Sequence, residues 1–210
     1  MKIRHFLAYC LSYGIWAAWN LTGGISLPLG PAASFAIDTA VKALIWIVPV
    51  YLVFRKCECR LIGFGETFQT PFPWYPTLIG LCLTAAFLHT AHIFLSGIDT
   101  WGIFHPMWIF LSMAAAVIEE LAFRGLLFNG QAAVHGIRKA AIMNGILFAV
   151  YHYPEFLIGR NLSAVIGLRF WVIFVMGTVF SLSFAKWKNL TMNIVIHFIW
   201  NMLCFWFALA

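Results

Sequence analysis

Residues 106–128 read PMWIFLSMAAAVIEELAFRGLLF, an apolar stretch that carries Glu119, Glu120 and Arg124 near its end. A helix needs about 20 mostly apolar residues to cross a bilayer, and this stretch is long enough. Comparable stretches occur at about residues 5–22, 34–54, 76–96, 140–153, 162–185 and 190–210. Because lipid offers no partner for open strand edges, they are expected to be helices. The sequence therefore predicts an all-α, polytopic membrane helix bundle with about seven transmembrane helices.

The composition agrees with a membrane protein. The 210 residues are 63% hydrophobic and only 10% charged, and the mean hydropathy is +0.90. A soluble domain carries about 25% charged residues. The low share of charged residues and the high share of hydrophobic ones exclude a soluble enzyme, a disordered chain and a nucleic-acid-binding domain. The expected partner is therefore the lipid bilayer, and no nucleic-acid partner is expected.

The basic residues predict the orientation. Seven spans assign each loop to one side of the membrane, and the net charge of +6 then reports topology. Only Arg160 falls on the outer side. The other side collects Lys2, Arg4, Arg55, Lys56, Arg60, Arg138, Lys139, Lys186 and Lys188. The N-terminus is therefore predicted to be cytoplasmic.

The breaks between the apolar stretches are short and have turn chemistry. Gly23-Gly24, the segment 71–76 with its three prolines, and Asn129-Gly130 are examples. No repeat or low-complexity tract separates one part of the chain from another. Residues 1–210 are therefore predicted to form a single transmembrane domain.

Ionisable residues inside apolar spans are costly, and each is a functional hypothesis. Glu120 lies nine residues before Asn129, His152 thirteen after Lys139, and His197 nine after Lys188. At 1.5 Å per residue these spacings place all three roughly 14–20 Å deep, near the middle of a bilayer core. Acidic and imidazole side chains from three helices are therefore expected at a similar height.

The local spacings suggest a chemistry for these residues. Glu120 and Arg124 are four residues apart, the favourable order for a carboxylate and a guanidinium on one helix face. His197 and Asn201 have the same spacing, so both can point into one cavity. A buried carboxylate can act as general base for water. Histidine and asparagine side chains can stabilise an oxyanion.

Three motifs together resemble a known family. Glu-Glu-x-x-x-Arg at 119–124, Phe-x-x-x-His at 148–152 and His-x-x-x-Asn at 197–201 follow one another on late spans. In this order they resemble the CAAX-protease and bacteriocin-processing family (CPBP, or Abi) of intramembrane endopeptidases. The resemblance covers about residues 106–205, the expected catalytic half. It also includes Gly125, Gly167 and Gly177.

The resemblance implies a glutamate-dependent protease embedded in the membrane. In that scheme Glu119 activates water and His152 helps to bind it. His197 and Asn201 form the oxyanion site, and Glu120 and Arg124 support the geometry. No metal or other cofactor is expected, because the chain lacks the H-E-x-x-H helix of many zinc proteases. Zinc held by the Glu and His side chains is the less favoured alternative.

Simpler roles exist for the same residues. Glu119, Glu120 and Arg124 can form a structural ion pair that joins helices. His152 can be a hydrogen-bonded core histidine. His197 and Asn201 can link helices by hydrogen bonds, as is common in membranes.

Other polar residues are given structural roles. Asp38 and Lys42 are four residues apart and are predicted to pair with each other. Asn144 and Asn193 are predicted to join helices by hydrogen bonds. His89 and His92 are expected to pack or to line a cavity.

The leading function is an intramembrane endopeptidase that cuts near the membrane-embedded or C-terminal part of a substrate. Its expected partner is a membrane-anchored protein or a precursor peptide, and its expected location is the prokaryotic plasma membrane, as a multi-pass protein. One alternative is a non-catalytic scaffold or immunity protein of the same fold. A transporter or proton relay is another, and the lack of an inverted repeat disfavours it.

Overall fold

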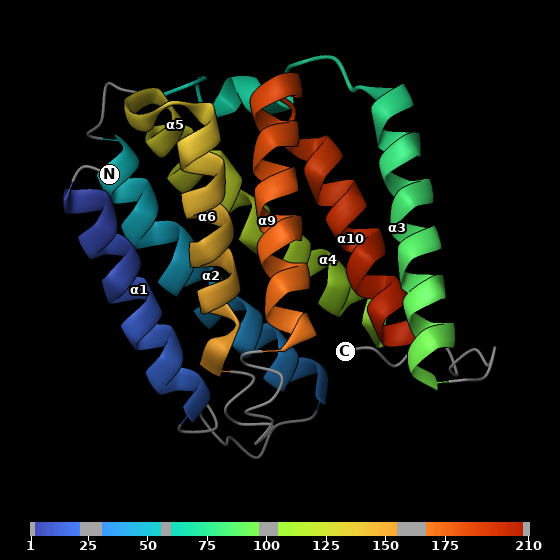
Figure 1. Cartoon of the computed structure of the whole chain (residues 1–210). Coiled ribbons are helices and arrows are strands. Elements are labelled where there is room, and N and C mark those ends of the chain that lie inside the picture. Colours follow the sequence, from blue (N-terminus) through green and yellow to red (C-terminus); the bar gives the residue numbers. More distant parts are fainter. Residues whose placement is uncertain (1–2, 22–30, 56–59, 97–104, 155–166, 208–210) are drawn as a thin grey trace.

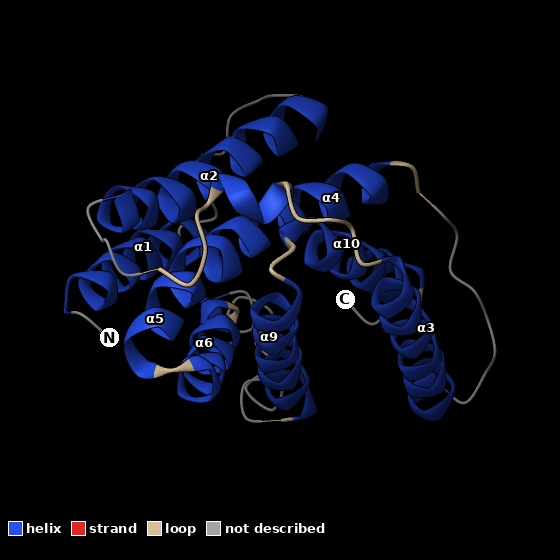
Figure 2. Ribbon diagram, turned by 90° about the horizontal axis from the view of Figure 1, so that it is seen from above, coloured by secondary structure: helices blue, strands red, loops and turns tan. Residues whose placement is uncertain are grey.

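The computed structural model describes residues 3–21, 31–55, 60–96, 105–154 and 167–207. All regular structure in these residues is helical, as Figure 2 shows, so the predicted all-α class is confirmed for them. The elements are α1 (Ile3–Leu21), α2 (Pro31–Arg55), the 3-10 helix η1 (Gly65–Phe68), α3 (Trp74–Ser96), α4 (Met107–Glu120), the π-helix η2 (Leu121–Phe128), α5 (Asn129–His135), α6 (Ile137–Tyr151), α9 (Leu168–Trp187) and α10 (Leu190–Trp206).

The predicted apolar stretches coincide with helices, with one internal difference. The stretch 106–128 begins as α4 but continues from Leu121 as a π-helix, a rare form that often marks functional sites. The start of the predicted span 162–185 lies outside the described residues. Two helical segments are long and apolar enough to cross a membrane, Trp74–Phe94 and Arg169–Trp187, and Leu190–Trp206 is a shorter apolar helix.

The count of seven spans and the cytoplasmic N-terminus stay predictions. The helices supply the necessary apolar segments, but no membrane is present to place them. Three residues used to assign the orientation, Lys2, Lys56 and Arg160, lie outside the described residues.

The helices form a bundle around α4, η2 and the first half of α10. In Figure 1, α1 lies at one end of the bundle and α3 at the other. Helix α1 packs on α2, α2 packs on η2 and α4, and α3 packs on α10. Residues 122–132 are all buried. This segment therefore lies at the centre of the bundle, together with its polar residues Arg124, Asn129 and Gln131.

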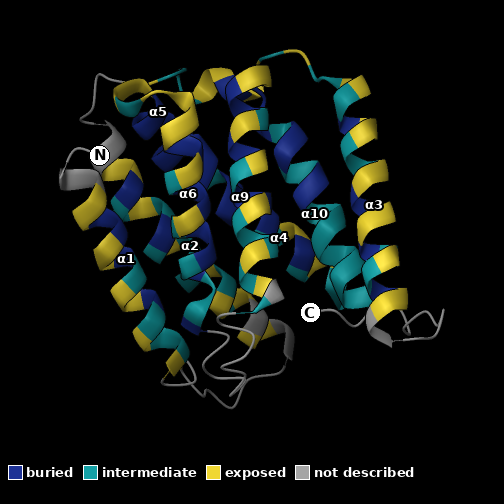
Figure 3. Ribbon diagram, viewed as in Figure 1, coloured by how far each residue is buried: buried dark blue, intermediate teal, exposed yellow. Residues whose placement is uncertain are grey.

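Helix α3 has many exposed positions, as Figure 3 shows, and several of them are large apolar residues. Tyr75, Leu83 and Phe94 on this helix are 77%, 65% and 85% exposed. A soluble monomer rarely exposes contiguous apolar surface of this kind, whereas a helix in contact with lipid does. The exposure therefore agrees with a membrane environment for α3.

Helices α6 and α9 pack closely through two glycines. A Cβ added to Gly145 would lie 2.8 Å from the carbonyl oxygen of Phe174, and one added to Gly177 would lie 3.1 Å from the Cα of Gly145. Small residues at a crossing let helix backbones approach each other in membrane proteins. This contact brings Gly177 and Ser181 on α9 beside the centre of the bundle.

Two buried asparagines attach the segment between α2 and α3 to the core. Asn129 accepts hydrogen bonds from the backbone N–H groups of Leu61 and Ile62 and donates to Ile62. Asn189 donates to the carbonyl oxygen of Thr70 and caps α10 by accepting from the N–H of Met192. Residues 61–70 are therefore attached to the core at both of their ends.

Candidate active site

Glu119 and Glu120 are the last two residues of α4, directly before the π-helix. Glu119 is 5% exposed and Glu120 is fully buried. Adjacent positions on a helix point about 100° apart. The two carboxylates therefore point in different directions and contact different sets of residues.

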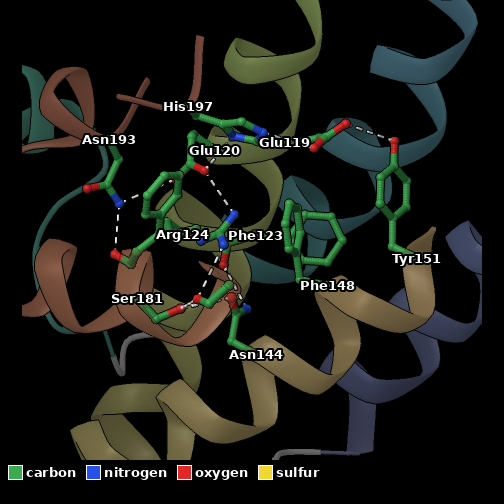
Figure 4. Close-up of polar contacts among 12 residues, drawn as sticks. Glu119, Glu120, Phe123, Arg124, Asn144, Phe148, Tyr151, Ser181, Asn193 and His197 are labelled. Atoms are coloured by element: carbon green, nitrogen blue, oxygen red, sulfur yellow. Dashed lines mark hydrogen bonds and ion pairs between the residues drawn. The ribbon is translucent and has the colours of Figure 1, made fainter. Parts of the chain in front are cut away.

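Glu120 lies in a closed cluster drawn from α4, η2 and α10. Its Oε1 accepts from Nη1 of Arg124 at 2.9 Å and lies 2.9 Å from Nδ1 of His197. Its Oε2 accepts from Nδ2 of Asn193 at 3.4 Å. Figure 4 shows these side chains converging on the carboxylate. The predicted pair of Glu120 and Arg124 is confirmed.

The guanidinium of Arg124 is fully buried and links the cluster to α9. Its Nη2 donates to the carbonyl oxygen of Gly177 at 3.3 Å. Its Cζ lies 4.2 Å from the ring centroid of Phe148, which places the cation over an aromatic face. The positive charge is thus compensated by a carboxylate, a carbonyl and a ring.

A second polar layer lies below Arg124. Ser181 donates to Oδ1 of Asn144 at 3.0 Å, and Asn144 donates to the carbonyl oxygen of Phe123 at 3.0 Å. These bonds join α6, α9 and η2, so the predicted joining role of Asn144 is confirmed. Asn193 joins helices too, through the carbonyl oxygen of Phe180 at 2.8 Å.

Glu119 has partners from other parts of the chain. Its Oε1 accepts from Nζ of Lys42 at 2.8 Å and from the hydroxyl of Tyr151 at 3.3 Å. Its Oε2 lies 3.6 Å from Nε2 of His197. One side of this carboxylate is therefore occupied by an ammonium and a phenol, and the other side faces an imidazole.

His197 lies between the two glutamates, as Figure 4 shows. Its Nδ1 contacts Glu120 and its Nε2 faces Glu119. The rings of Phe148 and Phe180 flank it edge-on, with centroids 6.0 and 5.7 Å away. An ionised Glu120 carboxylate can only accept hydrogen bonds, so Nδ1 of His197 carries the proton in this contact. The orientation of the ring is thus fixed by packing and by one hydrogen bond.

His152 and Asn201, the other predicted site residues, lie at the edge of the cluster and are partly buried. His152 follows α6, and its Nδ1 lies 2.9 Å from the carbonyl oxygen of Phe148. It is also close enough to Glu119 to interact with it electrostatically. Asn201 lies one helical turn beyond His197 on α10, and its side chain has no hydrogen-bond partner within the described residues.

The sequence reasoning missed two partners of Glu119, Lys42 and Tyr151. Lys42 was expected to pair with Asp38, but it binds Glu119, and Asp38 accepts from Nε1 of Trp19 at 2.8 Å. An ammonium within an apolar span needs a compensating charge, and this signal could have directed attention to the unpaired glutamate. Tyr151 had no such signal beyond its position next to His152.

The metal-free site stays a prediction. Across the described residues, no group of three or more His, Cys, Asp or Glu side chains is arranged to hold a metal ion. The possible donors Glu119, Glu120 and His197 are engaged with one another and with cationic side chains.

Comparison with known proteins shows which protein family the C-terminal half of the chain resembles. Residues 101–203 match the family model described as type II CAAX prenyl endopeptidase Rce1-like. A similar curated protein is CAAX prenyl protease 2 of Methanococcus maripaludis, with 29% identity over 103 residues that cover 45% of this chain. The matched region spans 38% of the length of that relative. No solved structure matches the chain.

These matches and the site define a helical, membrane-associated protein with a paired-glutamate centre. Residues 101–203 are thus similar to the CAAX prenyl endopeptidases, and the resemblance to the CAAX-protease and bacteriocin-processing family that the three motifs predicted is confirmed for this half of the chain. The matched residues contain all six predicted site residues, Glu119, Glu120, Arg124, His152, His197 and Asn201.

Proposed function

We propose that the chain is an intramembrane endopeptidase that hydrolyses a peptide bond near the membrane-embedded or C-terminal part of its substrate. The observation that carries this proposal is His197, one imidazole held between two buried carboxylates. Glu120 pairs with Arg124, and Glu119 pairs with Lys42 through Oε1 alone. Its Oε2 is turned toward the imidazole, and this oxygen is the group available for chemistry.

Glu119 is the proposed general base. It takes a proton from water, and the water oxygen adds to the carbonyl carbon of the substrate. His152, at the rim of the cluster, helps to hold that water. The same Glu119 then delivers the proton to the departing amine as the C–N bond breaks, so the carboxylate is ionised again at the end.

His197 and Asn201 are the proposed oxyanion donors. They lie one helical turn apart on α10 and share a face. In this role His197 acts with both ring nitrogens protonated: Nδ1 donates to Glu120, and Nε2, which is turned toward Glu119, donates to the oxygen of the reacting carbonyl. Glu120 and Arg124 position this imidazole and do not meet substrate, because both are fully buried.

The substrate class follows from the family and from the membrane setting. The relative is named a CAAX prenyl protease, and we propose a membrane-anchored protein or a precursor peptide as the substrate of this chain. We also propose a multi-pass location in a prokaryotic plasma membrane, with the seven predicted spans.

The test compares the parent protein with Glu119→Gln in lipid vesicles, using a prenylated peptide with a CAAX end as the probe. Cells that produce each protein are also compared by mass spectrometry of their membrane peptides. Glu119→Gln is expected to abolish cleavage while the protein still inserts. Glu66→Gln is the matched control, because Glu66 is exposed in η1, far from the cluster along the chain. Undiminished cleavage by Glu119→Gln would overturn the proposal.

A specific observation favours the second candidate, a non-catalytic scaffold or immunity protein. Both carboxylates are ion-paired, Glu119 with Lys42 and Glu120 with Arg124. A scaffold would keep partner binding in the Glu119→Gln variant, and the parent would release no fragments. The comparison of membrane peptides separates the two candidates directly.

A further inference from the structure

Lys42 connects the first part of the chain to the candidate active site. It lies in the middle of α2, outside the residues 101–203 that match the family model. Its Nζ is 2.8 Å from Oε1 of Glu119, and the two side chains are only 14% and 6% exposed. An ion pair so far from water is screened little by salt. It therefore acts strongly on the carboxylate.

Aromatic rings hold the ammonium in place. Nζ lies 5.3 Å from the ring centroids of both Trp16 on α1 and Tyr151 on α6. A cation near aromatic faces gains electrostatic stabilisation. Trp16 and Tyr151 are themselves stacked, with centroids 5.7 Å apart. The position of Lys42 is thus set by three helices.

This contact distinguishes the two oxygens of Glu119. Oε1 receives the ammonium and the hydroxyl of Tyr151. Oε2 is left facing Nε2 of His197. Because Lys42 and Tyr151 occupy the first oxygen, the carboxylate cannot rotate freely, and the second oxygen is the one directed toward the imidazole.

We propose that Lys42 is a positioning residue for Glu119: together with Tyr151 it holds Oε1, so that Oε2 is the oxygen turned to accept a proton from water. The inference rests on the proposed function and extends it to the N-terminal part of the chain. In this role Lys42 does not touch substrate. It acts through Glu119 alone.

The expected effect follows from the charges around Glu119. Lys42 comes from α2, Tyr151 and His152 from the end of α6, and His197 from α10. Glu120 and Arg124 of its own helical segment are paired with each other. Removal of Lys42 leaves Oε1 with the Tyr151 hydroxyl alone, so the carboxylate can turn and Oε2 loses its fixed direction toward His197.

The test measures kcat and KM for cleavage of the probe peptide by four variants in vesicles. Lys42→Met is expected to lower kcat about 10²-fold, the loss typical of a reacting group displaced by about 1 Å. KM is expected to stay within about twofold, since uniform binding is unaffected. Lys42→Arg should restore most of the lost kcat, because it keeps the ion pair. Lys186→Met removes an exposed lysine at the end of α9 and is the control for charge.

Lys42→Gln covers the case in which Lys42→Met fails to fold, because the amide keeps a donor and loses only the charge. A parent kcat in a folded Lys42→Met or Lys42→Gln protein would overturn the inference. Full cleavage by Glu119→Gln would instead overturn the proposed function. Inactive Glu119→Gln together with a parent kcat in the Lys42 variants would overturn the role of Lys42 alone.

Discussion

Glu119 and Glu120 are neighbours on the chain, yet their surroundings have little in common. Glu120 is fully buried, and its partners Arg124, Asn193 and His197 all come from the residues that match the family model. Glu119 is slightly exposed, and its closest partner, Lys42, comes from α2. One acid belongs to a closed network, and the other lies where the two parts of the chain meet.

The difference shows how one helix end can serve two purposes. A rotation of about 100° between successive residues is enough to direct one carboxylate inward and the other toward α1 and α2. The inward acid stabilises the bundle and orients His197. The other acid keeps a small exposed fraction, as the proposed exchange of protons with water requires.

The largest expected effect comes from breaking the closed network. Arg124→Met removes the cation from Glu120 and leaves a carboxylate buried without its ion-pair partner. Breaking a buried pair from one side costs about 3–5 kcal/mol. We expect a loss of that size in the free energy of unfolding, measured by thermal unfolding of the purified protein in detergent. Glu119→Gln should change it far less, and equal losses in both variants would refute the distinction between the two acids.

A matched pair of asparagines on α10 sharpens the comparison. Asn201→Ala is expected to lower kcat about 10²–10³-fold with little change in stability, as for the loss of an oxyanion donor. Asn193→Ala is expected to lower the free energy of unfolding by about 1–3 kcal/mol, since it leaves buried acceptors on Glu120 and Phe180 without their donor.

Kinetic and unfolding measurements on both proteins check this pair. If Asn201→Ala keeps the parent kcat, the amide has no role in catalysis. If Asn193→Ala unfolds at the parent temperature, the Glu120 network is weaker than its contacts indicate.

The smallest expected effect concerns the layer below Arg124. Ser181→Ala removes the hydroxyl that donates to Asn144 and to the carbonyl oxygen of Gly177. A typical net contribution is about 1 kcal/mol, visible as a small shift in the unfolding midpoint. The kcat should stay at the parent value. A large fall in kcat without destabilisation would show that this layer also takes part in the chemistry.

The helices were predictable because each apolar stretch is long and uninterrupted. The contact of Glu120 with Arg124 was predictable as well, because a spacing of four residues on a helix is a local property. The match of the three motifs to the family model needed only their order and spacing.

Contacts between distant segments were harder to foresee. Asp38 lies four residues before Lys42 on the same helix, and this local spacing favours a pair between them. Packing of α2 against η2 and α4 instead brings Glu119 to Lys42. The π-helix had no signal either, because its wider turns depend on the neighbours of residues 121–128 and not on their apolar character. Tertiary packing decides both features.

The wide turns after Glu120 have a consequence for how this segment tolerates insertions and deletions. A π-turn closes its hydrogen bond over one more residue than an α-turn does. Loss of a single residue between 121 and 128 could therefore be absorbed by a return to ordinary α pairing. Residues beyond the deletion would then keep their register. Asn129, whose side chain binds the backbone of Leu61 and Ile62, would keep these contacts. A deletion within α4 would instead turn everything beyond it by about 100°.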